Sequence, residues 1–456
     1  MWKDNKIPMG RREFLRRAGA AGMGGVAISM APFKAMARSE ISGPRGNGQG
    51  FWRQVSNEFI LDPHSVYMNI GTTGSMPRQV LQNYDRYNKL VASDPWHMGG
   101  EWGDWPYTGC LVERIAAQFG ADTDELMLSR NTTDGMCTII GSLNLQPGDE
   151  VLYTHHEHVA AESPLYVQAQ RHGVILTPVQ IPVFPGSEDE YVQAFANAVT
   201  ERTRLIVFSH ITYKTGARLP AERICQEVAI PKGIPTLIDG AHSIGMIDLD
   251  FHAIDCDFYA GSGHKWQCGP GATGILYVRE NADRLRDYWS DRAEVFWPIN
   301  SSLAEFGSFG LQTQLQYIGN DNYPAKRALA DVCDMWAGIG RDRIEAYVLS
   351  LSDYCKTLIR DFFGPSAVIY SPDIPGLDSG ITAFNPFADR TDLALLNEFR
   401  DRLRDEFGYI VRTTDFEITI GGAQEHALRI STHLFHGEQD VEGLVIAMRQ
   451  LYQLMV

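Results

Sequence analysis

Short apolar runs alternate with longer segments of helical period over residues 125–280, and this alternation limits the possible folds more than any other feature. The short runs are typical of strands, whereas the segments between them place apolar residues every three or four positions. Such alternation favours an α/β fold with a mostly parallel sheet covered by helices. The predicted strands are Glu150–Thr154, Val174–Pro178, Leu205–His210, Thr236–Asp239, Asp257–Ala260 and Gly274–Val278.

The pattern changes after Pro324, where two long helical segments precede short strands and a final helix. This change predicts a second, smaller α+β domain at the C-terminal end. The expected organisation is a signal peptide at 1–37, an N-terminal segment at 38–70, a large domain at 71–324 and a small domain at 325–456.

Charge and hydropathy exclude two classes of protein. The 456 residues contain 40 Lys and Arg against 56 Asp and Glu, a formal charge of −16, which argues against nucleic acid as a partner. No uninterrupted apolar stretch reaches the roughly 20 residues of a membrane helix, so we expect no membrane anchor after the signal is cleaved.

The N-terminus resembles a twin-arginine (Tat) export signal. Arg11-Arg12 precedes Phe14-Leu15, a weakly apolar Gly/Ala run follows, and Ala35-Met36-Ala37 provides small residues for cleavage. The alternative is a basic amphipathic helix, which the glycines of the run would destabilise. This pattern predicts export by the Tat machinery to the periplasm. The seven cysteines are odd in number and scattered, so we expect single thiols, with one disulfide left possible.

One lysine stands out because of its neighbours. Lys265 follows a predicted strand within Gly261-Ser262-Gly263-His264-Lys265, and further glycines come after it. A lysine amine forms Schiff bases when burial or nearby cations lower its pKa from about 10.4. Taken alone, a lysine in a Gly-rich loop is more often a solvated surface residue.

Two further elements are informative beside this lysine. The apolar run ending in Asp239-Gly240-Ala241-His242 places a carboxylate at a strand end, where it needs a cation such as a pyridinium, or else caps the next turn. Thr132 and Thr133 begin a helical run, and such a helix start binds phosphate or carries a plain N-cap.

These three elements in this order resemble the class V aminotransferase family of fold-type I pyridoxal phosphate (PLP) enzymes, and in particular its isopenicillin N epimerase-like branch. The resemblance covers roughly residues 65–455. It implies that Lys265 holds PLP as a Schiff base and moves protons, that Asp239 pairs with the pyridine nitrogen, and that His242 lies near the phenolic oxygen. It also implies a phosphate site made of Thr132, Thr133, Ser262 and His264.

The cluster Thr154-His155-His156-Glu157-His158 has two interpretations. The resemblance implies that His158 stacks on the cofactor. The rival is a zinc site of His155, His156 and His158, which is less favoured because adjacent residues of an extended segment point to opposite faces. Leu428-Arg429-Ile430-Ser431 alternates apolar and polar residues, and the resemblance implies that Arg429 binds the substrate carboxylate. The alternative is a surface arginine on an edge strand.

Differences from the family narrow the expected reaction. Desulfurases of this family use a nucleophilic cysteine before the carboxylate-binding arginine, but residues 412–429 contain none. The segment Ser209-His210-Ile211-Thr212-Tyr213 resembles the corresponding segment of the epimerase-like branch. The family also implies a homodimer in which Thr313 reaches the partner's phosphate.

The resulting expectation is a PLP enzyme acting on the α-amino group of an amino acid or peptide-linked amino acid through an external aldimine. Transamination, epimerisation and lyase chemistry share these residues, and the sequence does not choose among them. One alternative is a periplasmic tailoring enzyme similar to those of pyoverdine maturation. An alternative from another class is a non-catalytic periplasmic binding or metal protein.

Overall fold

The computed structural model describes residues 48–95, 109–305 and 310–456. The predicted signal peptide at 1–37 and the first ten residues of the segment at 38–70 therefore lie outside the described residues. Within the described ranges, no helix combines the length and the apolar character that a membrane crossing requires.

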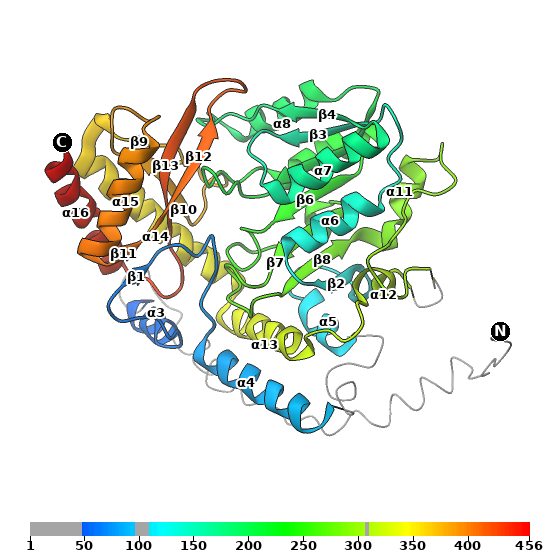
Figure 1. Ribbon diagram of the computed structural model, residues 1–456, viewed down its shortest axis with the longest axis horizontal. Coiled ribbons are helices and arrows are strands. Elements are labelled where there is room, and N and C mark those ends of the chain that lie inside the picture. The colour runs from blue at the N-terminus through cyan, green and yellow to red at the C-terminus, as the bar shows by residue number, and fades with distance from the viewer. Residues whose placement is uncertain (1–47, 96–108, 306–309) are drawn as a thin grey trace. The chain divides into compact units, whose positions relative to one another are not determined.

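The largest sheet confirms the α/β prediction (Figure 1). Its strand order is β2-β8-β7-β6-β5-β3-β4; the run from β4 to β7 pairs in parallel, and β8 is antiparallel to both neighbours. The strands are β2 (Leu126–Ser129), β3 (Glu150–Thr154), β4 (Ile175–Val179), β5 (Thr203–Ser209), β6 (Thr236–Gly240), β7 (Phe258–Ser262) and β8 (Gly274–Val278).

Helices cover this sheet because its strands are apolar on both faces. Figure 1 shows α6 and α7 lying side by side across one face, and α6 contacts β7 and β8. Their boundaries follow local chemistry, since Asn131 caps α6 and Gly173, at φ 68°, ends α7 in the left-handed region. The helices between residues 78 and 316 are α4 (Arg78–Ser93), which packs on α13 (Tyr323–Ile339) instead of the sheet, α5 (Gly109–Ala116), α6 (Thr132–Ser142), α7 (Val159–His172), α8 (Glu188–Ala198), α9 (Ala221–Arg223), α10 (Phe251–Ile254), α11 (Asp283–Tyr288) and α12 (Leu311–Gln316).

A second, antiparallel sheet forms the C-terminal part, with strand order β12-β13-β10-β9. Long helices pack with it around a separate apolar core, which includes Leu428 and Ile430. A short parallel pair joins the N-terminal segment to this part. The elements are α3 (Gly48–Ser56), β1 (Val66–Tyr67), α13 (Tyr323–Ile339), α14 (Arg341–Phe363), β9 (Val368–Ile369), β10 (Ile381–Asn385), α15 (Leu393–Phe407), β11 (Tyr409–Ile410), β12 (Arg412–Glu417), β13 (Gln424–Ser431) and α16 (Glu438–Met455).

Each strand predicted for the large sheet is present; β3 and β8 have the predicted ends, and the ends of the other four shift by one or two residues. The strands β1, β2, β9, β11 and β12 were not predicted, and β2 pairs with β8 across a long stretch of sequence. Helical spacing of apolar residues at 221–228, between two of the predicted strands, corresponds to the short helix α9 followed by a π-helix at Ile224–Ala229. The two sheets fall within the predicted large and small domains, while the boundary residues between the domains stay a prediction.

The sheet topology brings distant segments together. Because β2, β3, β5, β6 and β7 run in the same direction, their carboxyl ends lie along one edge of the sheet. Ligands of such sheets bind beyond the carboxyl ends of the strands. A ligand site is therefore expected among the segments that follow these strands.

Candidate functional site

A pocket of about 260 Å³ opens at this edge. Its lining comes from the loops after the five strands, from the segment after β1, and from the small sheet. The lining residues are Gly71, Thr72, Asn131, Thr132, Thr133, His158, Ala160, Tyr213, Asp239, Ala241, His242, Ser262, His264, Lys265, Arg412 and Arg429. Every sequence-predicted site residue except Thr313 lies in this pocket.

Lys265 lies in the turn that follows β7, so its amine enters the pocket from the centre of the sheet. Burial lowers the pKa of Lys265 to about 8; Asp239 opposes this shift, and Arg429 and Arg412 add to it. The fraction of uncharged amine near neutral pH is therefore far larger than in an ordinary lysine, as a nucleophilic lysine requires. The interpretation as a solvated surface lysine is wrong.

Asp239 is the one acidic residue among the described residues that line the pocket. It lies within the buried strand β6 and is 3% exposed. One carboxylate oxygen accepts a hydrogen bond from the Ala241 N–H at 2.9 Å, so this residue also caps the turn after its strand. Burial raises the pKa of Asp239, while the Ala241 N–H and the charge of Lys265 lower it. A cation in the pocket would hold this carboxylate ionised.

The protonation of His242 can be assigned from its neighbour. The Trp266 indole N–H lies 3.2 Å from His242 Nδ1, which must accept this hydrogen bond because an indole nitrogen only donates. Burial and the nearby charge of Lys265 hold the pKa of His242 well below its usual value. The ring is therefore neutral with its proton on Nε2, which makes Nε2 a hydrogen-bond donor.

The start of α6 contacts the end of β7 directly. The hydroxyl groups of Thr132 and Ser262 lie 2.7 Å apart, although 130 residues separate them. Asn131, and neither predicted threonine, is the N-cap of α6, because its side chain accepts from the Asp134 N–H. The threonines are thus available to a ligand. His264 Nδ1 is buried with no protein partner, as expected where a ligand supplies the missing one.

His158 caps α7 and lies beside Tyr213. Its Nδ1 accepts from the Ala160 N–H at 3.1 Å, which fixes the orientation of the ring. The two rings meet edge to face with centroids 5.1 Å apart. Burial and the charge of Lys265 lower the pKa of His158 to about 4. A neutral, oriented imidazole of this kind suits stacking on a flat ligand.

His155 and His156 are arranged differently from the prediction for an extended segment. His155 and His156 do not point to opposite faces, since their ring centroids are 4.1 Å apart. The reason is that β3 ends at Thr154 and both histidines lie in a turn. Neither joins His158 in a group of potential ligands among the described residues. His156 instead contacts the Glu417 carbonyl oxygen, and burial lowers its pKa to about 3.

Arg429 is buried in the pocket and is not a surface residue. It lies on β13, an inner strand of the small sheet, and is 2% exposed. Its guanidinium group contacts the Tyr213 carbonyl oxygen, the Asn69 amide oxygen and the Thr72 hydroxyl, each at 3.3 Å. Its Nε has no partner. Within the described parts of the chain, no carboxylate forms an ion pair with Arg429, so the pocket holds a buried charge that needs an anion.

The lining residues that the sequence did not predict include Gly71, Thr72 and Arg412. A Cβ on Gly71 would lie 2.9 Å from an Arg429 nitrogen and 3.2 Å from a His242 carbon, so a larger residue here would displace the Arg429 guanidinium group. The segment Asn69-Ile70-Gly71-Thr72, which begins two residues after the end of β1, was the available signal. Arg412 starts a strand that the sequence did not predict.

Thr313 lies on α12 and does not line the pocket. Its side chain is fully buried within one chain, and its hydroxyl has no protein partner. Its contact with a partner subunit stays a prediction, and such a contact would require α12 to uncover this side chain. The six cysteines whose side chains are described are free thiols.

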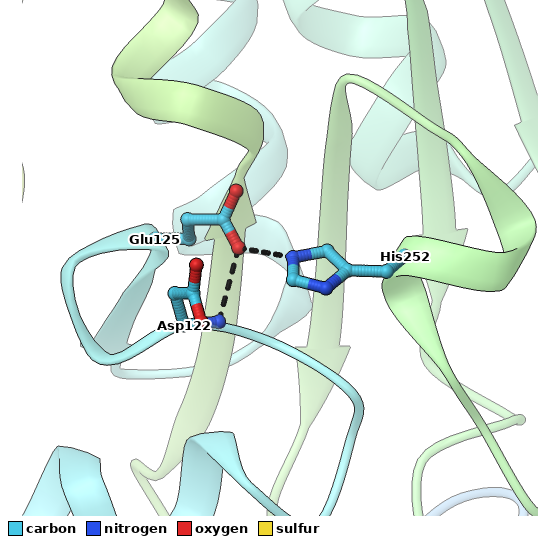
Figure 2. Close-up of side chains that lie close together, drawn as sticks. All are labelled: Asp122, Glu125 and His252. Atoms are coloured by element: carbon cyan, nitrogen blue, oxygen red, sulfur yellow. Dashed lines mark hydrogen bonds and ion pairs between the residues drawn. The ribbon is translucent and has the colours of Figure 1, made fainter.

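A second cluster of potential metal ligands lies away from the pocket (Figure 2). Asp122, Glu125 and His252 each offer a ligand atom within 4.8 Å of the others. Glu125 is already saturated, however: it accepts hydrogen bonds from the Asp122 N–H at 3.0 Å, the Glu280 N–H at 2.9 Å and His252 Nε2 at 2.6 Å. The cluster is therefore explained as a structural contact that holds the start of β2 against the end of β8.

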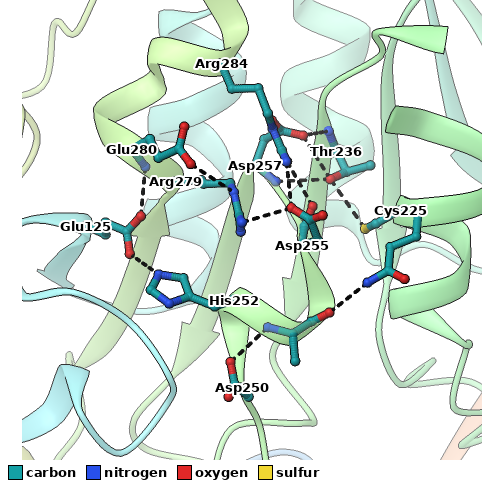
Figure 3. A network of polar contacts seen from close by, with 12 residues as sticks. Glu125, Cys225, Thr236, Asp250, His252, Asp255, Asp257, Arg279, Glu280 and Arg284 are labelled. Carbon is teal, nitrogen blue, oxygen red and sulfur yellow. Dashed lines mark hydrogen bonds and ion pairs between the residues drawn. The ribbon is translucent and has the colours of Figure 1, made fainter. Parts of the chain in front are cut away.

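Figure 3 places this contact in a wider polar network at the opposite, amino end of the sheet. Arg284 binds Asp255 at 2.6 Å and Asp257 at 2.8 Å, and Asp257 also accepts from the Thr236 N–H. Arg279 adds a second ion pair to Asp255. This network satisfies buried charges with protein partners, which is what the pocket does not do for Arg429.

We expect Glu125→Gln to destabilise the fold by about 1–3 kcal/mol at pH 7, since buried donors lose a charged acceptor. Burial raises the pKa of Glu125, but hydrogen bonds from Glu280, Asp122 and His252 outweigh it and the pKa is lowered. A lowered folded-state pKa means that this stability is present above the unfolded value of about 4.3 and is lost as pH falls through the folded value.

Urea unfolding at pH 7 and at pH 3.5 measures this difference. The difference in the free energy of unfolding between wild type and Glu125→Gln should be smaller at the lower pH. Glu222→Gln, at an exposed position, should change the free energy of unfolding little at either pH. A gap of equal size at both pH values would contradict the role of the ionised carboxylate.

Comparison with known proteins places the chain among relatives along most of its length. The sequence profile of the family described as aminotransferase class-V matches residues 66–398. The chain is similar to isopenicillin N epimerase from Amycolatopsis lactamdurans, with 30% identity over 407 residues, 88% of this chain and 98% of the relative. It is also similar to a cysteine desulfurase from Enterobacter sp., with 28% identity over 276 residues, 60% of this chain and 65% of the relative.

Solved structures share the fold. The cysteine desulfurase CsdA from Escherichia coli superposes with a TM-score of 0.69 at 22% identity, covering 89% of this chain and 99% of that chain. The structure of a C-DES mutant with glycine covalently linked to its PLP cofactor gives a TM-score of 0.68 at 19% identity, covering 85% and 97%.

Proposed function

This chain belongs to the class V aminotransferase family and is a PLP-dependent enzyme of fold type I, and from that premise we propose that it acts on the α-amino group of an amino acid or of a peptide-linked amino acid. One observation carries the proposal. A lysine with a lowered pKa, a carboxylate at a strand end and a buried arginine without a counterion share one pocket. Amine chemistry on a substrate that carries a carboxylate needs this combination.

The residues of the pocket fit PLP at each of its functional groups. Lys265 would hold the aldehyde carbon covalently, and Asp239 would pair with the protonated ring nitrogen. His242, with its proton on Nε2, would donate to the phenolic oxygen. His158 would stack on the ring. His242 and His158 take these roles in the neutral state that their surroundings favour, and the protonated ring nitrogen would hold Asp239 ionised.

The phosphate would bind where α6 begins. The hydroxyl groups of Thr132, Thr133 and Ser262 and the ring of His264 surround this position. The first turn of a helix presents N–H groups and the positive end of the helix dipole, and both favour an anion. The unpartnered Nδ1 of His264 supports this assignment.

The protein's own residues then divide the remaining tasks. When bound, PLP supplies an electron sink that stabilises negative charge at the substrate Cα. Arg429 binds the α-carboxylate through its planar guanidinium group and so orients the substrate. Lys265, with a pKa of about 8, removes or returns a proton at Cα, because a base with a pKa near the working pH is efficient.

The bond that breaks at Cα depends on the orientation that Arg429 and the pocket walls impose. Residues 412–429 contain no cysteine, so desulfuration through a nucleophilic cysteine in that segment is disfavoured. The similarity to isopenicillin N epimerases over 88% of the chain favours proton transfer at Cα, as in epimerisation or transamination. A tailoring reaction on a peptide-linked amino acid uses the same residues.

Borohydride reduction of the purified enzyme tests the proposal. Reduction should convert the cofactor linkage into a stable adduct, and peptide mass spectrometry should find the added mass on Lys265. A protein without visible absorption, or an adduct confined to other lysines, would contradict the proposed role of Lys265.

We further propose that the protein is exported folded to the periplasm through the Tat machinery, supported by Arg11-Arg12 and the small residues at 35–37. PLP is made in the cytoplasm, and cofactor binding stabilises the folded state, so folding and loading precede export. Replacing Arg11 and Arg12 by Lys should leave full-length, PLP-bound protein in the cytoplasm, measured by cell fractionation. Normal yield of processed variant in the periplasmic extract would overturn this proposal.

A homodimer is proposed on the family resemblance. We expect twice the chain mass in solution at micromolar concentration, measured by light scattering after size-exclusion chromatography. A strictly monomeric, fully active enzyme would rule out a site completed by a partner subunit.

A further inference from the structure

Two arginines lie next to each other on neighbouring strands of the small sheet, beside the pocket. Arg412 on β12 and Arg429 on β13 are directly paired in the antiparallel register. Paired residues of neighbouring strands project from the same face, with Cβ atoms about 4.5–5.5 Å apart. Both side chains line the pocket, so the pairing places two positive charges at one wall of it.

The two guanidinium groups are held near each other by one hydroxyl. Thr72 Oγ1 accepts from Arg412 Nη1 at 3.2 Å and from Arg429 Nη2 at 3.3 Å. Like charges in paired positions are destabilising. Burial and the charge of Arg412 together lower the pKa of Arg429 to about 10, which expresses the same repulsion.

Nothing acidic in the described parts of the chain compensates this pair. Neither arginine forms an ion pair there, and the acidic lining residue, Asp239, is assigned to the cofactor. Asp415, three residues from Arg412 on the same strand, is paired with His426 and accepts from the Gln424 side chain. A strand offset of three residues also places Asp415 on the other face of the sheet.

We propose that Arg412 binds a second anionic group of the substrate, so that the site selects amino acids, free or peptide-linked, with an acidic side chain. This inference rests on the proposed function, in which Arg429 takes the α-carboxylate. One carboxylate neutralises one of the two charges and leaves the other unpaired, whereas a dicarboxylic substrate neutralises both. Arg412 is the more exposed of the pair and lies on the edge strand of the small sheet.

Matched acidic and neutral amino acids test the proposal on the PLP-loaded enzyme. The probes are L-glutamate against L-glutamine and L-aspartate against L-asparagine, and the dissociation constant is read from the change in cofactor absorption. Wild type should bind the better acid at least about tenfold more tightly than its amide, as expected for a hydrogen-bonded ion pair.

Arg412→Gln should remove most of this preference by weakening the acid about tenfold and the amide less than about threefold. Arg412→Lys should keep part of it, because charge remains while the planar fork is lost. Lys214→Gln is the matched control: this lysine lies over the Tyr213 ring at 5.6 Å, outside the pocket lining, and its loss should preserve the preference.

Two outcomes would overturn the inference, and a third would overturn the proposed function on which it rests. Equal weakening of acid and amide by Arg412→Gln would mean that both arginines grip one α-carboxylate. Equal affinity of the wild-type enzyme for the acid and its amide would mean that Arg412 does not bind a second anionic group of the substrate. Absence of cofactor absorption and of an adduct on Lys265 would instead refute the proposed function on which the inference rests. Circular dichroism of Arg412→Gln, which changes an exposed residue, verifies that the fold of this variant is intact.

Discussion

Lys265→Ala should lower turnover by about a thousandfold or more and abolish the borohydride adduct, while the fold is retained. The substitution removes both the covalent link and the base that exchanges protons at Cα. The other pocket residues remain, so PLP should still bind without a covalent bond. Turnover, the reduced-peptide mass and the far-UV circular dichroism spectrum measure these three effects separately.

Lys214→Ala serves as the control, since this lysine is near the pocket but does not line it. It should retain the adduct on Lys265 and most of the turnover. Wild-type turnover in Lys265→Ala, or an adduct that persists there, would show that another residue performs this chemistry.

Arg429→Met should have opposite effects on binding and on stability. Binding of any amino acid should weaken by about a hundredfold or more, because the α-carboxylate loses a buried charged partner. The substrate-free enzyme should become more stable by about 1–3 kcal/mol, since an apolar side chain replaces a buried charge that no carboxylate neutralises. Titration followed by cofactor absorption measures the first effect, and urea unfolding measures the second.

The same substitution at Arg284 is the informative comparison. Arg284 forms ion pairs with Asp255 and Asp257, so Arg284→Met leaves a buried carboxylate unpaired and should destabilise by about 3–5 kcal/mol. The two variants should therefore change stability in opposite directions. Comparable destabilisation by Arg429→Met would show that Arg429 supports the fold and is not kept for an anion.

The local sequence was sufficient for six of the seven strands of the large sheet and for most of the pocket. Buried strands such as β6 are recognisable in the sequence as apolar runs. The helical segments between these runs predict that the strands are parallel. Because ligand sites in these sheets lie beyond the strand ends, Asp239, Lys265 and Thr132 could be assigned to one site from their positions after such runs. The family resemblance added their roles, which periodicity does not reveal.

Long-range pairing decided what the sequence left open. The opposition of Arg412 to Arg429 depends on the register of two strands, and β12 was not recognisable because its side chains alternate weakly between exposed and buried. The tautomer of His242 depends on Trp266, 24 residues away, and the saturation of Glu125 depends on Glu280, 155 residues away. In each case a local pattern determines which residues face the core, whereas the neighbours of a polar group, and hence its charge and function, are set by contacts between distant segments.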